Sequence, residues 1–454
     1  MKQPQGSDMW GRLVTRHETG LDDPNWEEIR KDLLVEKGVV NGQCQRCSNQ
    51  DLYRFQGQDS QGHPLQVAYC RQCIQMGRIS SMDDLYYLPD PRGSVLLNPP
   101  LVTTCMTWQG KLSKEQMRAA KEMVASFQNP DYPHMIHAVT GAGKTEMIFP
   151  AIDYILKRGG RVCLASPRID VCLELAPRLQ AAFEGVDLLL LYGEGDSYRY
   201  CPLLVATVHQ LLRFKEAFDL LIVDEVDAFP YAGDASLHFA VQRAVKPEGK
   251  LVYLTATPDK ELKQLVEKGR LKETVLPARY HGYPLPEPGF VWVGDWRKAI
   301  DQCQARSRLF RQIKTFLERP GSKLIFVPQI KDAENLYAWL KEKWPLDVVH
   351  SKDPKRKDKV QALRNGYLEG LITTTILERG VTFTNCQVYI LGANDPIFNQ
   401  AALVQMSGRA GRKKDYPWGQ VTYAHQGVSQ AMLAARREIR RMNQLARKQD
   451  LLND

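Results

Sequence analysis

MIHAVTGAGKTEMIFPAIDYIL (135–156) is the stretch of this 454-residue chain that decides the fold. A strand-like apolar run enters a loop containing Gly141 and Gly143, and an amphipathic helical pattern follows. Glycines at these places let backbone N–H groups approach a phosphate group. The Lys144 ammonium would reach the β- and γ-phosphates of a nucleotide, and the Thr145 hydroxyl would hold Mg²⁺. The segment therefore predicts an ATP-binding P-loop, although Ala138 stands where the general motif usually has its first glycine.

A second motif lies downstream, in FDLLIVDEVDAF (218–229). Its apolar run reads as a buried strand that ends in two adjacent carboxylates, Asp224 and Glu225. Beside a P-loop, Asp224 would hold Mg²⁺ through water and Glu225 would polarise the attacking water. The alternative is an exposed acidic turn, which is how we interpret Asp227. Together the two motifs predict an ATPase whose nucleotide-binding loop comprises Thr140, Gly141, Ala142, Gly143, Lys144 and Thr145.

Strand-like and helix-like segments alternate around these motifs. This alternation favours parallel sheets covered by helices on both faces, with ligands at the carboxyl ends of the strands. Prolines and glycines cluster in 277–289, where we expect the joint between two domains. Strands are predicted at 161–167, 250–258, 323–328 and 388–393, helices at 169–183, 307–321, 331–344 and 431–448, and a strand that runs into a helix at 203–214.

Four cysteines precede the P-loop as two CxxC pairs, CQRC (44–47) and CRQC (70–73). Each pair can turn two thiolates to one side, and Zn²⁺ prefers four such ligands in a closed site. The spacer between the pairs reads as strand, turn and strand. The residues Cys44, Cys47, Cys70 and Cys73 therefore predict a small zinc ribbon with a structural role. A redox dithiol and chance spacing are the alternatives, and His63 in the spacer could replace one thiolate.

Composition and charge narrow the class of protein. Hydrophobic residues make up 43% of the chain and charged residues 25%, as in ordinary globular proteins. Since no apolar run approaches the roughly 18 residues of a membrane span, and the N-terminus lacks the apolar core of a signal peptide, we expect a cytoplasmic protein. Peripheral attachment to the inner face of the cytoplasmic membrane stays open. Residues 289–454 carry 28 basic and 16 acidic side chains, an excess that favours a polyanion such as nucleic acid.

Four motifs resemble, in order and spacing, those of superfamily 2 helicases and translocases: TGAGKT (140–145), DEVD (224–227), TAT (255–257) and QMSGRAGR (405–412). The resemblance implies an α/β fold of two tandem RecA-like parallel-sheet domains with ATP between them. The predicted organisation is an N-terminal region, 1–100, with the zinc ribbon near 40–78, a first RecA-like domain, 101–280, and a second, 281–454.

The resemblance also implies roles for single residues. Arg409 and Arg412 would act as arginine fingers, stabilising charge on the transferring phosphoryl group when the domains close. Gln405 would face the nucleotide. Gln116 resembles the glutamine that recognises adenine, although a solvated helical glutamine is nearly as good an interpretation. The threonines of TAT would couple hydrolysis to domain movement or simply cap a strand end. The residues expected to contact the nucleic-acid backbone are Arg168, Thr207, Gln210, Thr373, Thr374 and Thr375.

Two further features indicate which family within this superfamily the chain resembles. A four-cysteine ribbon in front of such a motor is uncommon, and the strings DEVDAFP (224–230) and TTILERGVTF (374–383) are distinctive. Together they resemble the late-competence DNA-uptake ATPases, the ComFA family of transformable Gram-positive bacteria. That implies an ATP-driven single-stranded DNA translocase that helps draw transforming DNA across the cytoplasmic membrane. The implied partners are a phosphoribosyltransferase-like competence protein and the inner-membrane DNA channel, and an oligomer stays open.

Other interpretations stay open as well. A primosome-type restart helicase also combines zinc with this motor, but it needs a larger N-terminal DNA-binding region. Another superfamily 2 DNA or RNA helicase would share the core. A zinc scaffold that recruits partners, with the motor used as a switch, belongs to a different class. No separate strand-splitting domain is evident, which favours translocation over unwinding. The basic helix expected at 431–448 could bind DNA, dock on the motor or be solvated.

Overall fold

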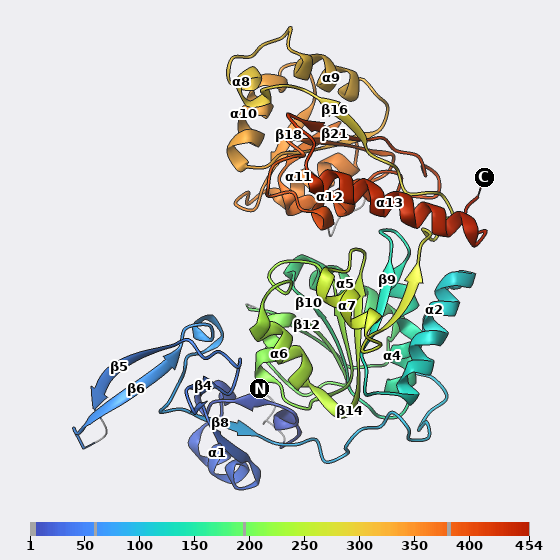
Figure 1. Cartoon of the computed structure of the whole chain (residues 1–454). Coiled ribbons are helices and arrows are strands. Elements are labelled where there is room, and N and C mark those ends of the chain that lie inside the picture. The colour runs from blue at the N-terminus through green and yellow to red at the C-terminus, as the bar shows by residue number, and fades with distance from the viewer. Residues whose placement is uncertain (1–5, 59–60, 194–196, 379–382, 454) are drawn as a thin grey trace. The chain divides into compact units, whose positions relative to one another are not determined.

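The structure is a computed structural model, and it describes residues 6–58, 61–193, 197–378 and 383–453 (Figure 1). The chain divides into two compact units: residues 1–137 with 145–274, and residues 138–144 with 275–454. A seven-stranded sheet and a six-stranded sheet form their centres. The predicted α/β fold with two RecA-like parallel sheets is therefore confirmed. Among the described residues, no helix combines the length and the apolarity that crossing a membrane requires.

The seven-stranded sheet has the order β11-β12-β10-β13-β14-β9-β15, and each neighbouring pair from β11 to β9 is parallel. Its central strands are continuous apolar runs, as expected where helices cover both faces. β13, β14 and β9 are adjacent, so the segments that follow them meet at one edge. The strands are β9 (His134–Ala138), β10 (Val162–Ser166), β11 (Leu188–Leu191), β12 (Leu203–Thr207), β13 (Phe218–Asp224), β14 (Val245–Thr255) and β15 (Lys272–Leu276).

The helices of this sheet begin at polar caps. Ser113 and Gln116 form a capping box at the start of α2, and Asp234 caps α6. The segment predicted as a strand running into a helix is β12 followed by a 3₁₀ helix, η6. The elements are α2 (Lys114–Ala125), α3 (Lys144–Met147), α4 (Phe149–Leu156), α5 (Ile169–Ala182), η6 (Val208–Arg213), α6 (Ala235–Ala244) and α7 (Lys260–Glu267).

The N-terminal region contains small antiparallel sheets in the orders β1-β8-β2, β3-β4 and β5-β6-β7. The spacer between the cysteine pairs forms the hairpin β5-β6, as predicted (Figure 1). All four cysteines share one hydrophobic core with Phe214 and Phe218 of the first unit. The elements are β1 (Leu13–Val14), α1 (Asp23–Ile29), β2 (Leu34–Lys37), β3 (Val39–Val40), β4 (Gln43–Cys44), β5 (Leu52–Gln58), β6 (Pro64–Cys70), β7 (Ile79–Ser80) and β8 (Asp84–Tyr87).

The six-stranded sheet has the order β16-β21-β20-β17-β19-β18, and all of its neighbouring pairs are parallel. Its strands are β16 (Gly289–Trp292), β17 (Ser322–Phe326), β18 (Leu346–Val349), β19 (Gly370–Thr373), β20 (Cys386–Leu391) and β21 (Val421–His425). Its helical elements are α8 (Trp296–Asp301), α9 (Arg308–Leu317), α10 (Ile330–Leu340), α11 (Arg356–Arg364), η7 (Thr375–Leu377), α12 (Gln400–Ser407) and α13 (Gln430–Lys448).

Candidate ATPase site and four-cysteine centre

The P-loop follows β9 and leads directly into α3, which begins at Lys144. Gly141 and Gly143 have φ angles of 82° and 76°, a left-handed conformation that favours glycine. The Ala142 N–H donates to the carbonyl of Val139 at 3.2 Å, which closes the turn. Successive backbone N–H groups in such a loop form a concave anion site. The observed backbone therefore fits the phosphate-binding role predicted for this loop.

The two carboxylates of the DEVD motif lie where β13 ends, at Asp224. Glu225 has a φ of 58°, which is uncommon for a residue other than glycine. Its backbone N–H donates to Asp224 Oδ1 at 2.8 Å, and this bond fixes the turn. Both side chains are half-buried. A carboxylate oxygen of Asp224 and the hydroxyl of Thr145 are the hard oxygen ligands that Mg²⁺ prefers, so the donor set fits this metal.

The prediction for Asp227 was wrong, because its side chain is half-buried and does not form an exposed acidic turn. Asp227 Oδ1 accepts a hydrogen bond from the Thr255 hydroxyl at 2.9 Å, and Oδ2 accepts one from the Thr257 hydroxyl at 2.7 Å. The threonines belong to the TAT motif at the end of β14, the strand beside β13. A single carboxylate therefore joins the loop after β13 to the loop after β14. The spacing of the motifs did not indicate this contact.

The arginine-rich motif follows α12 in the second unit. Gln405 is buried on α12, and Arg409 is 6% exposed. Arg409 Nε donates to the Glu378 carbonyl at 2.7 Å, which fixes the side chain to the segment after η7. Arg412 is half-buried. The two arginines and Gln405 thus come from one helix and the turn that follows it.

Sequence reasoning missed Arg279, which supports that turn. Its side chain is buried, and Nη1 donates to the Ala410 carbonyl at 2.9 Å. A second hydrogen bond reaches the carbonyl of Gly411, a residue with a φ of 59°. Burial, with a smaller contribution from the charge of Arg412, lowers the pKa of Arg279 to about 9. Arg279 lies in the proline-rich segment predicted as a joint, and its sequence context gives no sign of this contact.

Gln116 is buried at the start of α2, where its Oε1 accepts from the Ser113 N–H at 2.8 Å. The S-x-x-Q spacing is the sequence signal of a capping box. This geometry gives the Gln116 carbonyl a structural task, and the solvated-glutamine interpretation is wrong. Recognition of adenine stays a prediction.

The residues predicted to contact nucleic acid fall in two places, besides Arg168 at the start of α5. Thr207 and Gln210 lie in and beside η6, and both are buried; Gln210 Oε1 accepts from Arg213 at 3.2 Å. Thr373 ends β19, and its buried hydroxyl donates to the Val349 carbonyl at 2.8 Å, so this hydroxyl serves the sheet. Thr374 and Thr375 are half-buried beside it. Their contacts with nucleic acid stay predictions.

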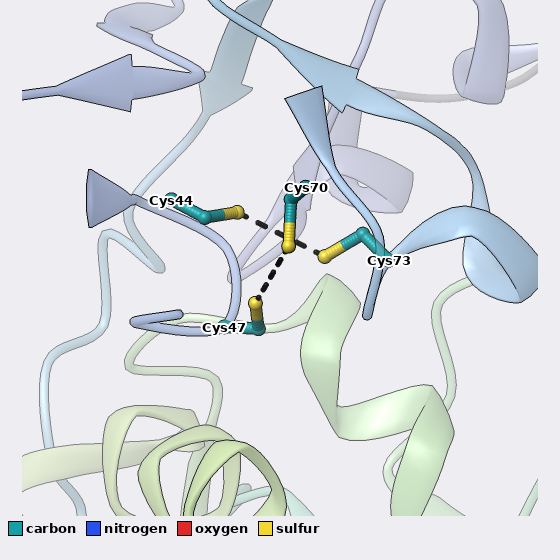
Figure 2. A group of neighbouring side chains, drawn as sticks. All are labelled: Cys44, Cys47, Cys70 and Cys73. Carbon is teal, nitrogen blue, oxygen red and sulfur yellow. Dashed lines mark hydrogen bonds between the residues drawn. The ribbon is translucent and has the colours of Figure 1, made fainter. Parts of the chain in front are cut away.

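The four cysteines converge, as Figure 2 shows. All four side chains are buried, and their sulfur atoms lie within 4.8 Å of one another. The Sγ atoms of Cys44 and Cys73 are 3.8 Å apart, and those of Cys47 and Cys70 are 3.4 Å apart. Four sulfurs at about 2.3 Å around one Zn²⁺ would be about 3.8 Å apart, so the cluster fits a closed tetrahedral zinc site.

The four thiols interact with one another, and these contacts shift their pKa values in opposite directions. Hydrogen bonding with Cys47 lowers the pKa of Cys44 to about 7. Hydrogen bonds from the other three thiols lower the pKa of Cys70. The same set of contacts raises the pKa of Cys47 and Cys73, so the four thiols share protons among themselves. The thiolate is the form that binds metal, and metal binding would displace these protons. The donor set, four sulfurs, is that of a structural site with no open position.

The segment that joins the first two cysteines, residues 44–47, is called the cysteine turn, and it is held against η6 and α6 of the same unit. The side chain of Arg46, between Cys44 and Cys47, is fully buried and forms an ion pair with Glu18. Glu18 also pairs with Arg213 of η6 at 3.1 Å. Burial alone would raise the pKa of Glu18, but the nearby Arg46 outweighs it and lowers that pKa.

Arg243 of α6 makes a second connection between the cysteine turn and η6. Its guanidinium donates to the carbonyls of Gln45 and Arg46 at 2.8 and 2.7 Å. It also donates to the carbonyls of Leu212 and Phe214 at 2.8 and 3.1 Å. Burial lowers the pKa of Arg243 to about 10. The sequence left open what the four-cysteine ribbon contacts, and these bonds show that its cysteine turn packs on η6 and α6 within the first unit.

Comparison with known proteins defines the class. Residues 307–414 match the helicase conserved C-terminal domain, and residues 109–260 match the type III restriction enzyme res subunit. The chain is similar to the structure of S. cerevisiae Dbp5 bound to RNA and ADP BeF3, with a TM-score of 0.55 and 17% sequence identity. The similarity covers 73% of this chain and 88% of that one, and it shows the fold alone. The fold and these families define a nucleic-acid-dependent ATPase of the helicase type.

The N-terminal region identifies the family. Residues 11–87 match the ComFA N-terminal domain. The chain is 46% identical to the competence protein ComFA of Bacillus subtilis, over 89% of this chain and 86% of the relative. It is 40% identical to that of Streptococcus pneumoniae, over 97% of this chain and 98% of the relative. The chain belongs to the ComFA family of competence-related superfamily 2 DNA helicases or translocases, as the sequence motifs predicted.

Proposed function

We propose that this protein is an ATP-driven translocase on single-stranded DNA that helps import transforming DNA across the cytoplasmic membrane during competence. It would act in the cytoplasm, at the inner face of that membrane. Its proposed partners are the phosphoribosyltransferase-like competence protein and the inner-membrane DNA channel. The observation that carries the proposal is the Asp227 bridge, because it ties the turn that bears Glu225 to the TAT threonines.

Each residue of the proposed ATPase site would have a separate role in binding or hydrolysing the nucleotide. The P-loop N–H groups and Lys144 would bind the phosphates, with Thr145 and Asp224 as the residues that hold Mg²⁺. When bound, this ion would neutralise charge that develops on the phosphate oxygens. Glu225 would orient and polarise the attacking water. A change at the γ-phosphate would move Glu225, and the Asp227 bridge would pass that movement to the end of β14.

The second unit would complete the reaction. Arg409 and Arg412 are proposed to stabilise negative charge on the transferring phosphoryl group, and Gln405 to face the nucleotide. Arg279 would hold the turn that carries both arginines, through its bonds to Ala410 and Gly411. The four cysteines would bind zinc in a structural role, since their donor set leaves no position for a reacting molecule.

The test is ATP hydrolysis with single-stranded DNA, duplex DNA or RNA present in turn. We expect the largest stimulation with single-stranded DNA and loss of turnover in Lys144→Ala and Glu225→Gln. Arg412→Ala should lower kcat by roughly 10³-fold. Displacement of streptavidin from biotinylated single strands would then report movement. No stimulation by any nucleic acid would refute the motor, and preference for RNA would refute the DNA substrate.

A cell-based assay separates the motor from a scaffold. In a competent host, chromosomal Lys144→Ala should abolish uptake of transforming DNA while the protein accumulates normally. If uptake continues at the wild-type rate, the chain works as a zinc scaffold and hydrolysis is dispensable. Binding to the phosphoribosyltransferase-like protein, measured with both purified proteins, tests the proposed partner.

A further inference from the structure

Helix α13 in the second unit is fixed to its domain on one side. Its apolar residues pack toward α12, and Asn443 is buried with them. Asn443 Oδ1 accepts from the Leu285 N–H at 2.8 Å, and its Nδ2 donates to the Leu285 carbonyl at 2.9 Å. The buried residues of the helix are Met432, Ala435, Glu438, Ile439, Met442, Asn443 and Ala446. Among the interpretations of this helix, docking on the motor is confirmed, and its other side is still to be explained.

On that other side, the side chains of α13 itself border an open arginine-lined groove with a volume of about 430 Å³. Arg437, Arg440 and Arg441 are exposed, and the Arg436 guanidinium lies 4.0 Å from the centre of the Phe290 ring. The stacking on Phe290 holds one guanidinium in place without neutralising it. The groove is lined by Leu433, Arg436, Arg437, Arg440, Arg441 and Gln444.

Repulsion between these arginines destabilises the helix. Arg436 and Arg440, and likewise Arg437 and Arg441, are four residues apart, where like charges repel. Two ion pairs with these arginines are seen among the described residues: Glu287 lies 2.7 Å from Arg440, and Glu438 lies 2.7 Å from Arg441. Within the part of the chain that the structure describes, four guanidinium groups with two carboxylates leave an excess of positive charge along the groove. A polyanion would relieve this repulsion.

We propose that the arginine groove of α13 binds the phosphodiester backbone of single-stranded DNA. The inference rests on the proposed function, because it gives the second unit a place to hold the transported strand. Guanidinium forks bind phosphate oxygens with two parallel hydrogen bonds and do not read the base sequence. A membrane surface is the weaker candidate, because an interfacial helix must bury its apolar side in lipid. That side of α13 is already packed in the domain.

The test compares two double variants of the full-length protein. Arg437→Gln with Arg440→Gln removes two groove charges. Arg311→Gln with Lys314→Gln removes two exposed charges from α9, where Lys314 likewise pairs with a carboxylate, Glu318. Binding of a fluorescent oligothymidylate is measured by anisotropy over a series of salt concentrations. Each phosphate contact with a single strand contributes about 0.7 to the slope of log K against log salt concentration.

The groove variant should lose about 1.4 from this slope and bind roughly 10- to 30-fold more weakly at about 0.1 M salt. The α9 variant should bind like the wild type, and both should keep the ATPase rate measured without DNA. Arg437→Lys with Arg440→Lys should retain most of the salt slope because it retains the charge.

Equal weakening in both glutamine variants would overturn the inference, since overall charge would then explain the loss. So would unchanged DNA binding together with lost flotation on phosphatidylglycerol vesicles, which would make the groove a membrane contact. If the wild type itself fails to bind the oligonucleotide, the proposed function fails as well, and the two failures are thereby distinguishable.

Discussion

Arginine side chains at the cysteine turn and on helix α13 face in opposite directions. At the cysteine turn the guanidinium groups of Arg46 and Arg243 face inward, onto a carboxylate and four carbonyls. On α13 the arginines face outward, and the apolar side makes the attachment. A buried guanidinium needs fixed acceptors, whereas an exposed one remains available to a ligand. The comparison therefore separates arginines that hold the fold from arginines that can bind.

The largest effect should follow loss of the metal ligands. Cys70→Ser with Cys73→Ser leaves two thiols, so we expect loss of the single zinc that metal analysis should find in the wild type. Structural zinc contributes about 10 kcal/mol or more to small sites. Hydrogen exchange should therefore accelerate in the cysteine turn and in residues 208–213, which the Arg243 and Glu18 contacts connect to it.

The control for this prediction is Cys303→Ser, which changes an exposed cysteine far from the cluster in sequence. It should leave both the zinc content and the exchange rates unchanged. Unchanged exchange in residues 208–213 after zinc loss would show that the cysteine turn and η6 are not mechanically connected. A metal-free wild type with a reversible disulfide would instead restore the redox interpretation.

The next largest effect concerns the buried ion pair between Arg46 and Glu18. Arg46→Met should lower the free energy of unfolding of the first unit by about 3 kcal/mol, because it leaves Glu18 buried with a weaker set of partners. Urea denaturation measures the change. Arg54→Met on β5 removes an exposed arginine of the same ribbon and should change the free energy of unfolding by less than about 0.5 kcal/mol. Similar values for the two variants would refute the distinction between inward and outward arginines.

The buried carboxylate of Asp90 allows a test of how stability depends on pH. Asp90 is bound to Arg92 and to Lys246, whose Nζ lies 3.0 Å from it. Burial would raise the pKa of Asp90, but the hydrogen bonds from Arg92 and the charge of Lys246 lower it to about 2. The folded pKa is below the unfolded value of about 3.9, so the carboxylate stabilises the fold above pH 4 and ceases to do so as the pH falls toward 2.

The variant Asp90→Asn should therefore lower the free energy of unfolding by about 2 kcal/mol at neutral pH. Its difference from the wild type should shrink toward zero between about pH 4 and pH 2. Measuring the difference at each pH cancels effects that both proteins share, such as acid release of metal. Asp23→Asn, at a side chain that is 97% exposed, is the control and should show little change at any pH. A difference that stays constant down to pH 2 would contradict the lowered pKa.

Local spacing explains what the sequence predicted well. The P-loop, the paired carboxylates and the CxxC pairs each place their functional groups within a few residues, so geometry follows from the motif. The contacts of Asp227, Arg46 and Arg279 join segments that are far apart in the chain. Side-chain direction at such positions depends on how strands order in the sheet and how loops pack, which periodicity does not encode. For the same reason, the sequence did not predict which arginines are buried and which are exposed.

The smallest effect should come from the pair at the edge of the α13 groove. Arg440 and Glu287 are 53% and 39% exposed, so their ion pair should contribute at most about 1 kcal/mol to stability. Glu287→Gln should therefore unfold at almost the same urea concentration as the wild type. The same change frees Arg440 for a phosphate and removes a repulsive charge, so single-stranded DNA should bind about fivefold more tightly at about 0.1 M salt. Glu318→Gln on α9 removes an exposed carboxylate that pairs with Lys314 and should not change DNA affinity. Tighter binding in both variants would assign the gain to net charge, whereas tighter binding in Glu287→Gln alone would place the strand beside Arg440.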